Sequence, residues 1–456
     1  MSVFCAIDIL TLFLCNYPGS LSPDSIDQIV QLTRGVYSNH HPFWHTMIIK
    51  ACVSFGMAVF HDMNAAVACY SIFQIIVISA CFTFALTTLC QAGVPAPAVA
   101  LLLICGAVMP YNIIYSFTMW KDVLFGGMCL VLIVSLYRII YGIGSDKFNT
   151  VSLFWSCLGM CLLRSNGFFS FACSVIVFFA FFRTKYIRIL GIFIIAAVIA
   201  FAMKYPLLKE LNVSQPSVIE SISIPLQQIA RVLADGREIT AGQRELLGKI
   251  MDVDAVPASY KRYISDPVKI LVYVSGHQDY LLEHKGEYLK LWFEIGMKFP
   301  REYLKGWVDQ TRGFWHGGYK YRIWTIGVYD SPDTVRLGIR PEINCDWAHD
   351  VRDSCLDAFM NNAALMPFVS IGFNFWLLAF FCCCNIINHR RTETFLAVPC
   401  MAIVVSLMIA TPVFSEFRYA YALFVSLPFI ILSSVYCLDS GKHKGETGFE
   451  GSRLRH

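Results

Sequence analysis

Charged residues are scarce in this chain. Asp, Glu, Lys and Arg make up only 15% of its 456 residues, against about a quarter in an average soluble domain. Hydrophobic residues make up 56%, and the mean hydropathy is +0.57. The scarcity of charge excludes an ordinary soluble globular protein and predicts an all-α polytopic membrane protein. The net charge of +4 says little about partners, because membrane proteins distribute Lys and Arg according to their topology.

The chain also lacks a zinc-binding cysteine pattern, an internal repeat and a low-complexity segment. Most of its 18 cysteines lie in apolar runs, where cysteine packs as a small hydrophobic residue. No C-x-x-C pair or Cys/His cluster has zinc spacing. Cys345 and Cys355 differ, because they lie in a long polar stretch. An oxidising exterior would permit a disulfide between them, and two buried free thiols are the alternative.

Apolar runs long enough to cross a bilayer, about 20 residues each, are abundant. We expect ten spans, at residues 3–17, 65–90, 97–115, 123–141, 151–163, 167–183, 187–203, 366–386, 394–412 and 419–437. Clusters of Lys and Arg orient the spans, because such clusters stay in the cytoplasm. We therefore expect both chain ends in the cytoplasm, together with the basic clusters at 138–147, 183–188, 390–391 and 442–455.

These spans divide the chain into four parts. Residues 1–203 form an N-terminal transmembrane module, whose first outer loop is 18–64. Residues 204–365, the one large polar block, form a mainly helical extracytoplasmic domain. Residues 366–438 carry the last spans, and residues 439–456 form a cytoplasmic tail.

The first outer loop begins with a predicted surface helix. Ser and Pro are favoured at a helix start and acids in the first turn, as in Ser22-Pro23-Asp24. We expect a short amphipathic helix over 22–34. On the simplest interpretation, Asp24 and Asp27 only stabilise its start.

The apolar segment 43–60, FWHTMIIKACVSFGMAVF, is predicted to be a second surface helix. Its length is modest, and Lys50 lies in its middle. If it crossed the membrane, the basic clusters that follow would keep their side only if the first span were inverted. We therefore expect two outer juxtamembrane helices, 22–34 and 43–60.

Ionisable residues recur in other short loops at the same membrane face. For any one loop, an interfacial anchor is an equally simple interpretation. Together with Asp24, however, these loops favour a shared site in which cations hold a phosphate and a carboxylate accepts a proton. The loop residues are Lys121, Asp122, Arg164, Asn166, Glu416 and Arg418.

The order of these motifs resembles the GT-C class of integral-membrane glycosyltransferases. That class includes protein O-mannosyltransferases and the transferases that add aminoarabinose to lipid A. Its first loop carries an acid on one juxtamembrane helix and a stretch with Pro and Trp on a second. Here "SPDS" (22–25) and "NHHPFWH" (39–45) take those positions. With "TMWKD" (118–122), they look similar also to an uncharacterised bacterial family of GT-C-like membrane proteins.

The resemblance implies inverting transfer of a sugar from a polyprenyl-phosphate donor to a cell-envelope glycan or lipid. It also implies the bacterial plasma membrane, with the active site on the extracytoplasmic face. Asp24 would be the general base or a metal ligand, Asp27 a weaker candidate and Asp122 the second-loop acid. Many members carry adjacent first-loop acids, whereas Ser25 follows Asp24 here. This departure weakens the case for Mg²⁺ or Mn²⁺ on Asp24 and Asp122.

The remaining candidates are assigned to substrate binding. His40 and His41 are equally well explained as interface histidines before a proline turn. Trp315 belongs to an aromatic stretch, 311–324, for which a membrane-interface patch is favoured over a sugar-binding lid. The predicted substrate-binding residues are Lys121, His40, His41, Arg164, Asn166, Arg418, Glu416 and Trp315.

Two other functions are alternatives. A polysaccharide polymerase or ligase would share the location and the lipid-linked donor but would transfer a chain. A transporter or flippase belongs to a different class, and the chain shows no internal repeat of the kind that transporters often have. We expect the partners to be the lipid-linked donor, its acceptor and membrane lipids, with no nucleic acid.

Overall fold

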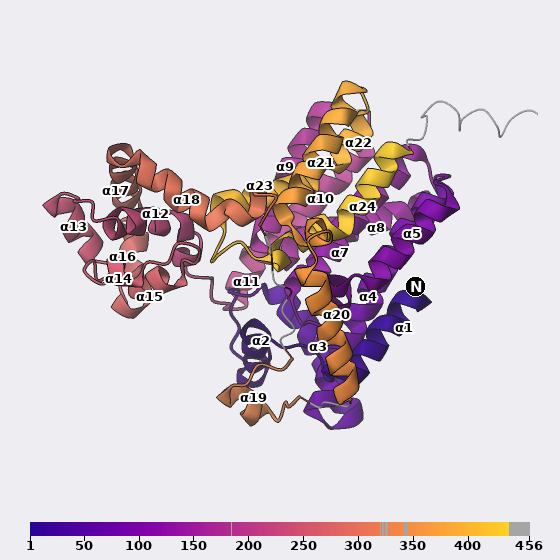
Figure 1. Cartoon of the computed structure of the whole chain (residues 1–456), viewed down its shortest axis with the longest axis horizontal. Coiled ribbons are helices and arrows are strands. Elements are labelled where there is room, and N and C mark those ends of the chain that lie inside the picture. Colours follow the sequence, from indigo (N-terminus) through magenta and orange to yellow (C-terminus); the bar gives the residue numbers. More distant parts are fainter. Residues whose placement is uncertain (184, 320, 322, 324–326, 342–344, 437–456) are drawn as a thin grey trace, which may run out of the picture.

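The computed structural model describes residues 1–183, 185–319, 321, 323, 327–341 and 345–436. Within these residues the protein is all α-helical, and its only β-type contacts are isolated bridges. A helical bundle forms the body of the molecule, and a smaller helical cluster projects from it (Figure 1). The predicted all-α class is therefore confirmed.

The bundle combines helices from both ends of the chain. The first outer loop contributes α2 (Pro23–Arg34) and α3 (Phe43–Phe60). The other bundle elements are α1 (Ser2–Thr11), η1 (Leu12–Asn16), α4 (Met63–Gln91), α5 (Ala96–Val108), α6 (Pro110–Ser116), α7 (Lys121–Tyr141), α8 (Asp146–Leu163), α9 (Ser165–Phe182), α10 (Ile187–Lys204), η3 (Met366–Val369), α21 (Ile371–Ile387), α22 (Arg391–Leu396), α23 (Val398–Ala410), η4 (Phe417–Ala420) and α24 (Tyr421–Val435).

Seven of the described helices are long and apolar enough to cross a membrane, or eight if the pair α5–α6, bent by 57°, counts as one span. The chain is therefore a multi-pass integral membrane protein, with fewer qualifying helices than the ten expected. α1 with η1, and α21, are apolar but shorter, and α8 begins with the charged residues Asp146 and Lys147. These helices nevertheless pack within the bundle, α8 along α7 and α21 along α24.

The helix α3 is the segment that the sequence predicts to lie on the outer membrane surface. It forms a hairpin with α4, and only His61 and Asp62 separate the two helices. By length and composition α3 also qualifies as a span. The hairpin is compact because Gly56 has no side chain: a Cβ there would collide with the backbone of Ala66.

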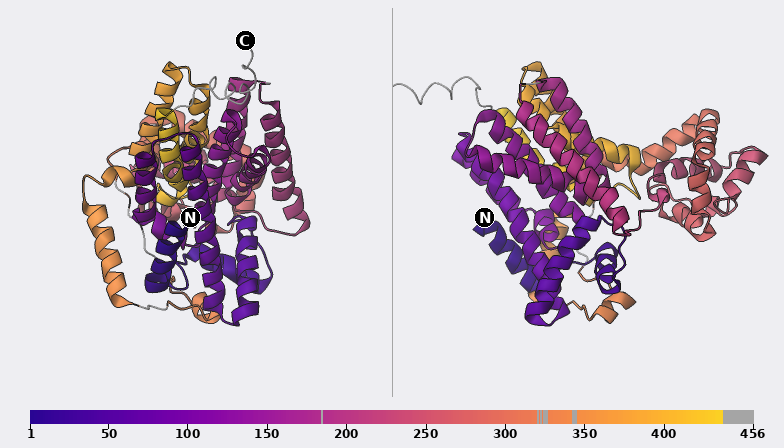
Figure 2. Two further views of the ribbon diagram at one scale, coloured as in Figure 1. Left: turned by 90° about the vertical axis from the view of Figure 1, so that its right-hand side faces the viewer. Right: turned by 180° about the vertical axis from the view of Figure 1, so that it is seen from behind.

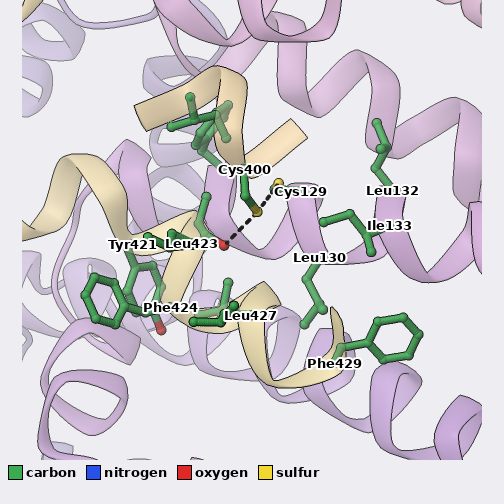
Figure 3. Close-up of a cluster of buried hydrophobic side chains, with 14 of the residues drawn as sticks. Cys129, Leu130, Leu132, Ile133, Cys400, Tyr421, Leu423, Phe424, Leu427 and Phe429 are labelled. Carbon is green, nitrogen blue, oxygen red and sulfur yellow. Dashed lines mark hydrogen bonds between the residues drawn. The ribbon is translucent and has the colours of Figure 1, made fainter. Parts of the chain in front are cut away.

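The core of the bundle is built around α7, whose side chains are buried along most of its length. Figure 3 shows Leu130 of α7 beside Leu427 of α24, within one apolar cluster. A Cβ on Gly126 would lie 2.9 Å from the Tyr421 ring, so a small residue is needed for this close approach. The packing fixes the amino-terminal end of α7, where Lys121 lies.

The projecting cluster has a hydrophobic core of its own, formed within residues 219–303. Its longest helix, α18 (Pro300–Trp315), continues to the bundle and packs against α21 and α23 (Figure 1). The Trp307 indole donates a hydrogen bond to the Met408 carbonyl at 2.8 Å. The other elements are η2 (Val218–Glu220), α12 (Ser223–Ala234), α13 (Ala241–Gly248), α14 (Val256–Ser259), α15 (Asp266–Ser275), α16 (Gln278–Glu283) and α17 (Lys285–Lys298).

The rest of the 204–365 block packs on the bundle instead. α11 (Pro206–Glu210) buries Leu208 against Phe43 at the start of α3. α19 (Pro332–Leu337) contacts α2, and α20 (Asp346–Asn361) contacts η1. The block predicted as one domain therefore consists of a projecting cluster and segments that return to the bundle. The tail 439–456 and Trp324 lie outside the described residues.

Cys345 and Cys355 are two separate thiols. They belong to one helix, α20 with its N-cap, and about 15 Å of helix separates them. A disulfide requires Cα atoms within about 7 Å. The disulfide alternative is therefore wrong. The thiols are free, but neither is buried as the other alternative expected: Cys345 is half-buried and Cys355 is exposed.

Two helical glycines provide a matched test of the bundle. A Cβ on Gly167 of α9 would collide with the Met160 carbonyl oxygen of α8, whereas a Cβ on Gly191 of α10 meets nothing within 4 Å. Gly167→Ala should destabilise the protein by about 1–3 kcal/mol because backbone cannot easily move aside. Gly191→Ala should be neutral or stabilising. Thermal unfolding of both variants in detergent measures the difference, and equal midpoints would contradict the packing of α8 on α9.

Candidate functional site

Two polar contacts hold α2 against the amino-terminal end of α7. Ser22 is the N-cap of α2, as predicted, and the Trp120 indole donates to its hydroxyl at 2.8 Å. Ser25 Oγ donates to the Met119 carbonyl, also at 2.8 Å. Because Asp24 lies between these serines, its carboxylate is brought beside the first turn of α7. The predicted helix over 22–34 is thereby confirmed.

Asp24 contacts two cations from distant parts of the chain. Arg418 Nη1 donates to Asp24 Oδ2 at 3.0 Å, and Lys121 Nζ lies 3.8 Å from the same oxygen. Burial acts to raise the pKa of Asp24, but Lys121 and Arg418 together outweigh it and hold that pKa well below its usual range. Asp24 is therefore a carboxylate at physiological pH.

Arg418 is fixed by a second acid and an aromatic ring. Its Nε lies 2.9 Å from Glu416 Oε2, and its guanidinium carbon lies 4.7 Å from the centre of a Trp120 ring. Burial raises the pKa of Glu416, and Arg418 opposes that shift. A guanidinium held in this way suits recognition of a phosphate or carboxylate.

Asp122 and Arg164 form the most deeply buried ion pair of the site. Their side chains are 1% and 7% exposed, and Arg164 Nη1 donates to Asp122 Oδ1. The same nitrogen donates to the Tyr419 carbonyl at 3.1 Å. This pair joins the first turn of α7 to the α8–α9 junction and to η4.

An open pocket of about 510 Å³ lies beside Asp24. The neighbouring acid Asp27 is 55% exposed and accepts a hydrogen bond from Gln31 at 2.9 Å. The pocket therefore offers carboxylates, imidazoles and an amide, which are groups that bind sugar hydroxyls. Its lining residues are Pro23, Asp24, Asp27, Gln31, Ser38, His40 and His41.

His41 links this pocket to Lys121. Burial, aided by Lys121, lowers the pKa of His41 to about 2, so its imidazole is neutral. Its Nδ1 lies 3.2 Å from Lys121 Nζ and accepts from that ammonium group. Its Nε2 lies 3.8 Å from Asp27 Oδ2, but with a neutral ring this contact is no ion pair.

A buried polar chain beneath α2 was missed at the level of sequence. His45 Nδ1 lies 3.1 Å from Gln28 Oε1, and its Nε2 lies 2.7 Å from the Tyr70 hydroxyl. Tyr70 donates to Gln74, whose amide binds the carbonyls of 115, 116 and 118. These hydrogen bonds tie α2, α3 and α4 to the end of α6 and to the loop before α7. The sequence signal that could have indicated this buried chain is the presence of two polar residues, His45 and Gln74, within apolar runs.

Two predicted site residues lie elsewhere. Asn166 donates to Ser406 Oγ on α23 at 3.1 Å, so it serves helix packing. The Trp315 ring stacks on the Trp307 ring, with 6.2 Å between the ring centroids. The Trp315 carbonyl accepts a hydrogen bond from the Trp376 indole at 2.7 Å. The structure therefore brings together the other nine candidates: Asp24, Asp27, His40, His41, Lys121, Asp122, Arg164, Glu416 and Arg418.

The donor set does not fit Mg²⁺ or Mn²⁺. Asp24 already faces two cations, and Asp122 is paired with Arg164. A divalent ion would add its charge next to these cations. Among the described residues, no group of three or more His, Cys, Asp or Glu side chains is arranged to hold a metal.

A model of a family of unknown function, DUF6020, matches residues 31–447. The chain belongs to this family. The match includes His41, Lys121, Asp122, Arg164 and Arg418, and it begins after the two acids of α2. No curated protein and no solved structure matches this DUF6020 chain.

The Asp122–Arg164 pair yields a stability prediction. Arg164→Met should destabilise this DUF6020 protein by about 3–5 kcal/mol, because it leaves the Asp122 charge buried without a partner. Adding Asp122→Asn should restore much of that loss. The matched control is Arg188→Met. Arg188 pairs with Asp146, and because their side chains are 58% and 62% exposed, this pair contributes little to stability. Thermal unfolding in detergent measures all variants; equal losses for Arg164→Met and Arg188→Met would refute the buried pair.

The neutral state of His41 yields a pH prediction. In the unfolded chain a histidine binds a proton near pH 6.5, whereas folded His41 stays neutral. Stability should therefore fall as the pH drops below 6.5, by up to about 1.4 kcal/mol per pH unit from this group. His41→Asn should flatten that fall. Unfolding midpoints between pH 7.5 and 5.5 give the two slopes, and parallel slopes would show that His41 titrates normally.

Proposed function

We propose that this protein is a membrane glycosyltransferase of the GT-C type. It transfers a sugar, with inversion, from a polyprenyl-phosphate donor to a glycan or lipid acceptor of the cell envelope, on the extracytoplasmic face. One observation carries the proposal: Asp24 contacts Lys121 and Arg418, from two separate helix ends, at the edge of an open pocket. The resemblance of the first loop to GT-C enzymes adds to it.

An apolar groove near this site supports a lipid-linked substrate. The groove has a volume of about 510 Å³ and is lined by side chains of α3, α4, α7, α8 and α10. Leu124 in the groove lies one helical turn after Lys121, and Trp44 lies three residues after His41. A prenyl chain in the groove would therefore keep its phosphate within reach of the cations. The groove residues are Trp44, Ile48, Phe73, Val77, Leu124, Met128, Phe154, Trp155, Leu158, Gly159, Leu162, Leu163, Ile199 and Met203.

The reaction needs a base and a stabilised leaving group. The Asp24 carboxylate accepts the proton of the acceptor hydroxyl, and the acceptor oxygen forms a bond to the anomeric carbon of the sugar. The bond between that carbon and the phosphate oxygen breaks, and polyprenyl phosphate leaves with the electron pair. Lys121 and Arg418 stabilise the negative charge that develops on the phosphate.

Binding of the donor should also raise the pKa of the Asp24 carboxylate. In the free protein, Lys121 and Arg418 hold the pKa of Asp24 low, which makes it a weak base. A phosphate that shares these cations adds a nearby negative charge, and like charges raise the pKa of a carboxylate. Asp24 thus becomes a stronger base only when the donor is bound.

Asp24→Asn tests the proposal directly. The variant keeps the shape of the side chain but loses the base, so transfer should fall by about 10²- to 10⁴-fold. In the native host, sugar-charged polyprenyl phosphate should accumulate and one surface glycan decoration should disappear. Lipid extracts and surface glycans analysed by mass spectrometry provide the readout.

The matched control is Asp27→Asn, one turn further along α2. Its carboxylate is exposed and contacts neither Lys121 nor Arg418 among the described ion pairs. Because Asp27 lines the pocket without contacting either cation, its loss should lower transfer far less than the loss of Asp24. If Asp24→Asn inserts normally and leaves both the lipid intermediates and the glycans unchanged, the proposed transferase function is wrong.

A further inference from the structure

A cavity of about 1230 Å³ lies at the other end of the bundle. Tyr141, the last residue of α7, lines it, whereas Lys121, the first residue of α7, contacts Asp24. The 21 residues of this helix separate the two places by about 30 Å. The cavity is therefore distinct from the Asp24 site.

Two loops from different halves of the chain form the cavity. One follows α9 and the other follows α21, and both reach the same end of the bundle (Figure 2). Together they contribute four cations, Arg183, Lys185, Arg390 and Arg391. Among the described lining residues the one acid is Glu393, which is 1% exposed and accepts a hydrogen bond from the Tyr141 hydroxyl.

The positive charge of this cavity is not neutralised within the described part of the chain. None of its four cations has a described carboxylate oxygen within 4.0 Å, unlike the cations of the Asp24 site. Arg390 Nη1 donates to the Ser434 carbonyl at 2.7 Å, which holds its side chain at the cavity. Four cations around one hollow repel one another unless an anion occupies it.

The backbone of both loops is unusual at the cavity. Arg183 has φ +49° and His389 has φ +55°, and non-glycine residues rarely adopt such values. Residues held in these conformations persist where the surrounding structure over-determines them, often at ligand-binding positions. Each loop therefore places one non-glycine residue in a rare backbone conformation beside the cavity.

We propose that this cavity binds the phosphate group of an anionic ligand. Arginine guanidinium groups match phosphate oxygens with paired hydrogen bonds, and lysine adds a point charge. Basic pockets between transmembrane helices recognise lipid headgroups in this way. The same chemistry accepts a soluble phosphate, so the source of the phosphate group is the question for experiment. This site is independent of the proposed transferase function.

The test compares two double variants of the full-length protein in detergent. Lys185→Gln/Arg391→Gln removes two cations from the cavity. Lys147→Gln/Arg188→Gln removes two exposed cations outside its lining, on α8 and α10. Dioleoyl phosphatidylglycerol is the lipid probe, with dioleoyl phosphatidylcholine for comparison, and inorganic phosphate is the soluble probe. Native mass spectrometry measures retained lipid, and thermal unfolding measures stabilisation by each probe.

The two arms distinguish the source of the phosphate group. If wild type and control retain phosphatidylglycerol and the cavity variant binds it at least about tenfold more weakly, the ligand is a lipid headgroup. If inorganic phosphate stabilises wild type and control but not the cavity variant, the ligand is soluble. Equal behaviour of all three proteins in both arms overturns the proposal. Should the cavity variant fail to fold, Lys185→Gln against Lys147→Gln makes the same comparison.

Discussion

The candidate site depends on one buried ion pair, Asp122 with Arg164. The pair joins the start of α7 to the α8–α9 junction, and Arg164 also binds the Tyr419 carbonyl. Lys121 precedes Asp122 in the chain and Arg418 precedes Tyr419, so the pair fixes the backbone from which both cations reach Asp24. Breaking a buried charge pair costs several kcal/mol of stability. The Asp122–Arg164 pair therefore holds the backbone of the polar site in place at the edge of the apolar bundle.

The two ends of α7 present opposite electrostatic situations. Around Asp24, acids and cations balance, so a phosphate must compete with Asp24 for Lys121 and Arg418. At the other end, the described lining of the cavity holds four cations and one buried acid. The first arrangement suits a ligand that enters, reacts and leaves, whereas the second suits a ligand that stays.

Sequence alone predicted the all-α membrane class and the meeting of loops at Asp24, because charged residues at span ends must lie near the membrane face. It did not predict that Asn166 faces Ser406, or that His45, Tyr70 and Gln74 form a buried chain. Those outcomes depend on helix rotation and on partners far apart in sequence. The ten expected spans exceed the seven or eight described helices that qualify by length and composition, because several apolar runs form short, bent or polar-ended helices within the bundle. The surface position of 43–60 stays a prediction.

The proposed lipid-phosphate site at Asp24 is tested most directly by photo-crosslinking with a polyprenyl phosphate that carries a diazirine on its prenyl chain. We expect crosslinks to concentrate in the groove segments of α3 and α7, around Trp44, Ile48, Leu124 and Met128. Unlabelled polyprenyl phosphate should compete, and replacement of both Lys121 and Arg418 by Gln should weaken the labelling. Crosslinks spread over the whole bundle, or labelling insensitive to the competitor and to these cations, would contradict a lipid-phosphate site at Asp24.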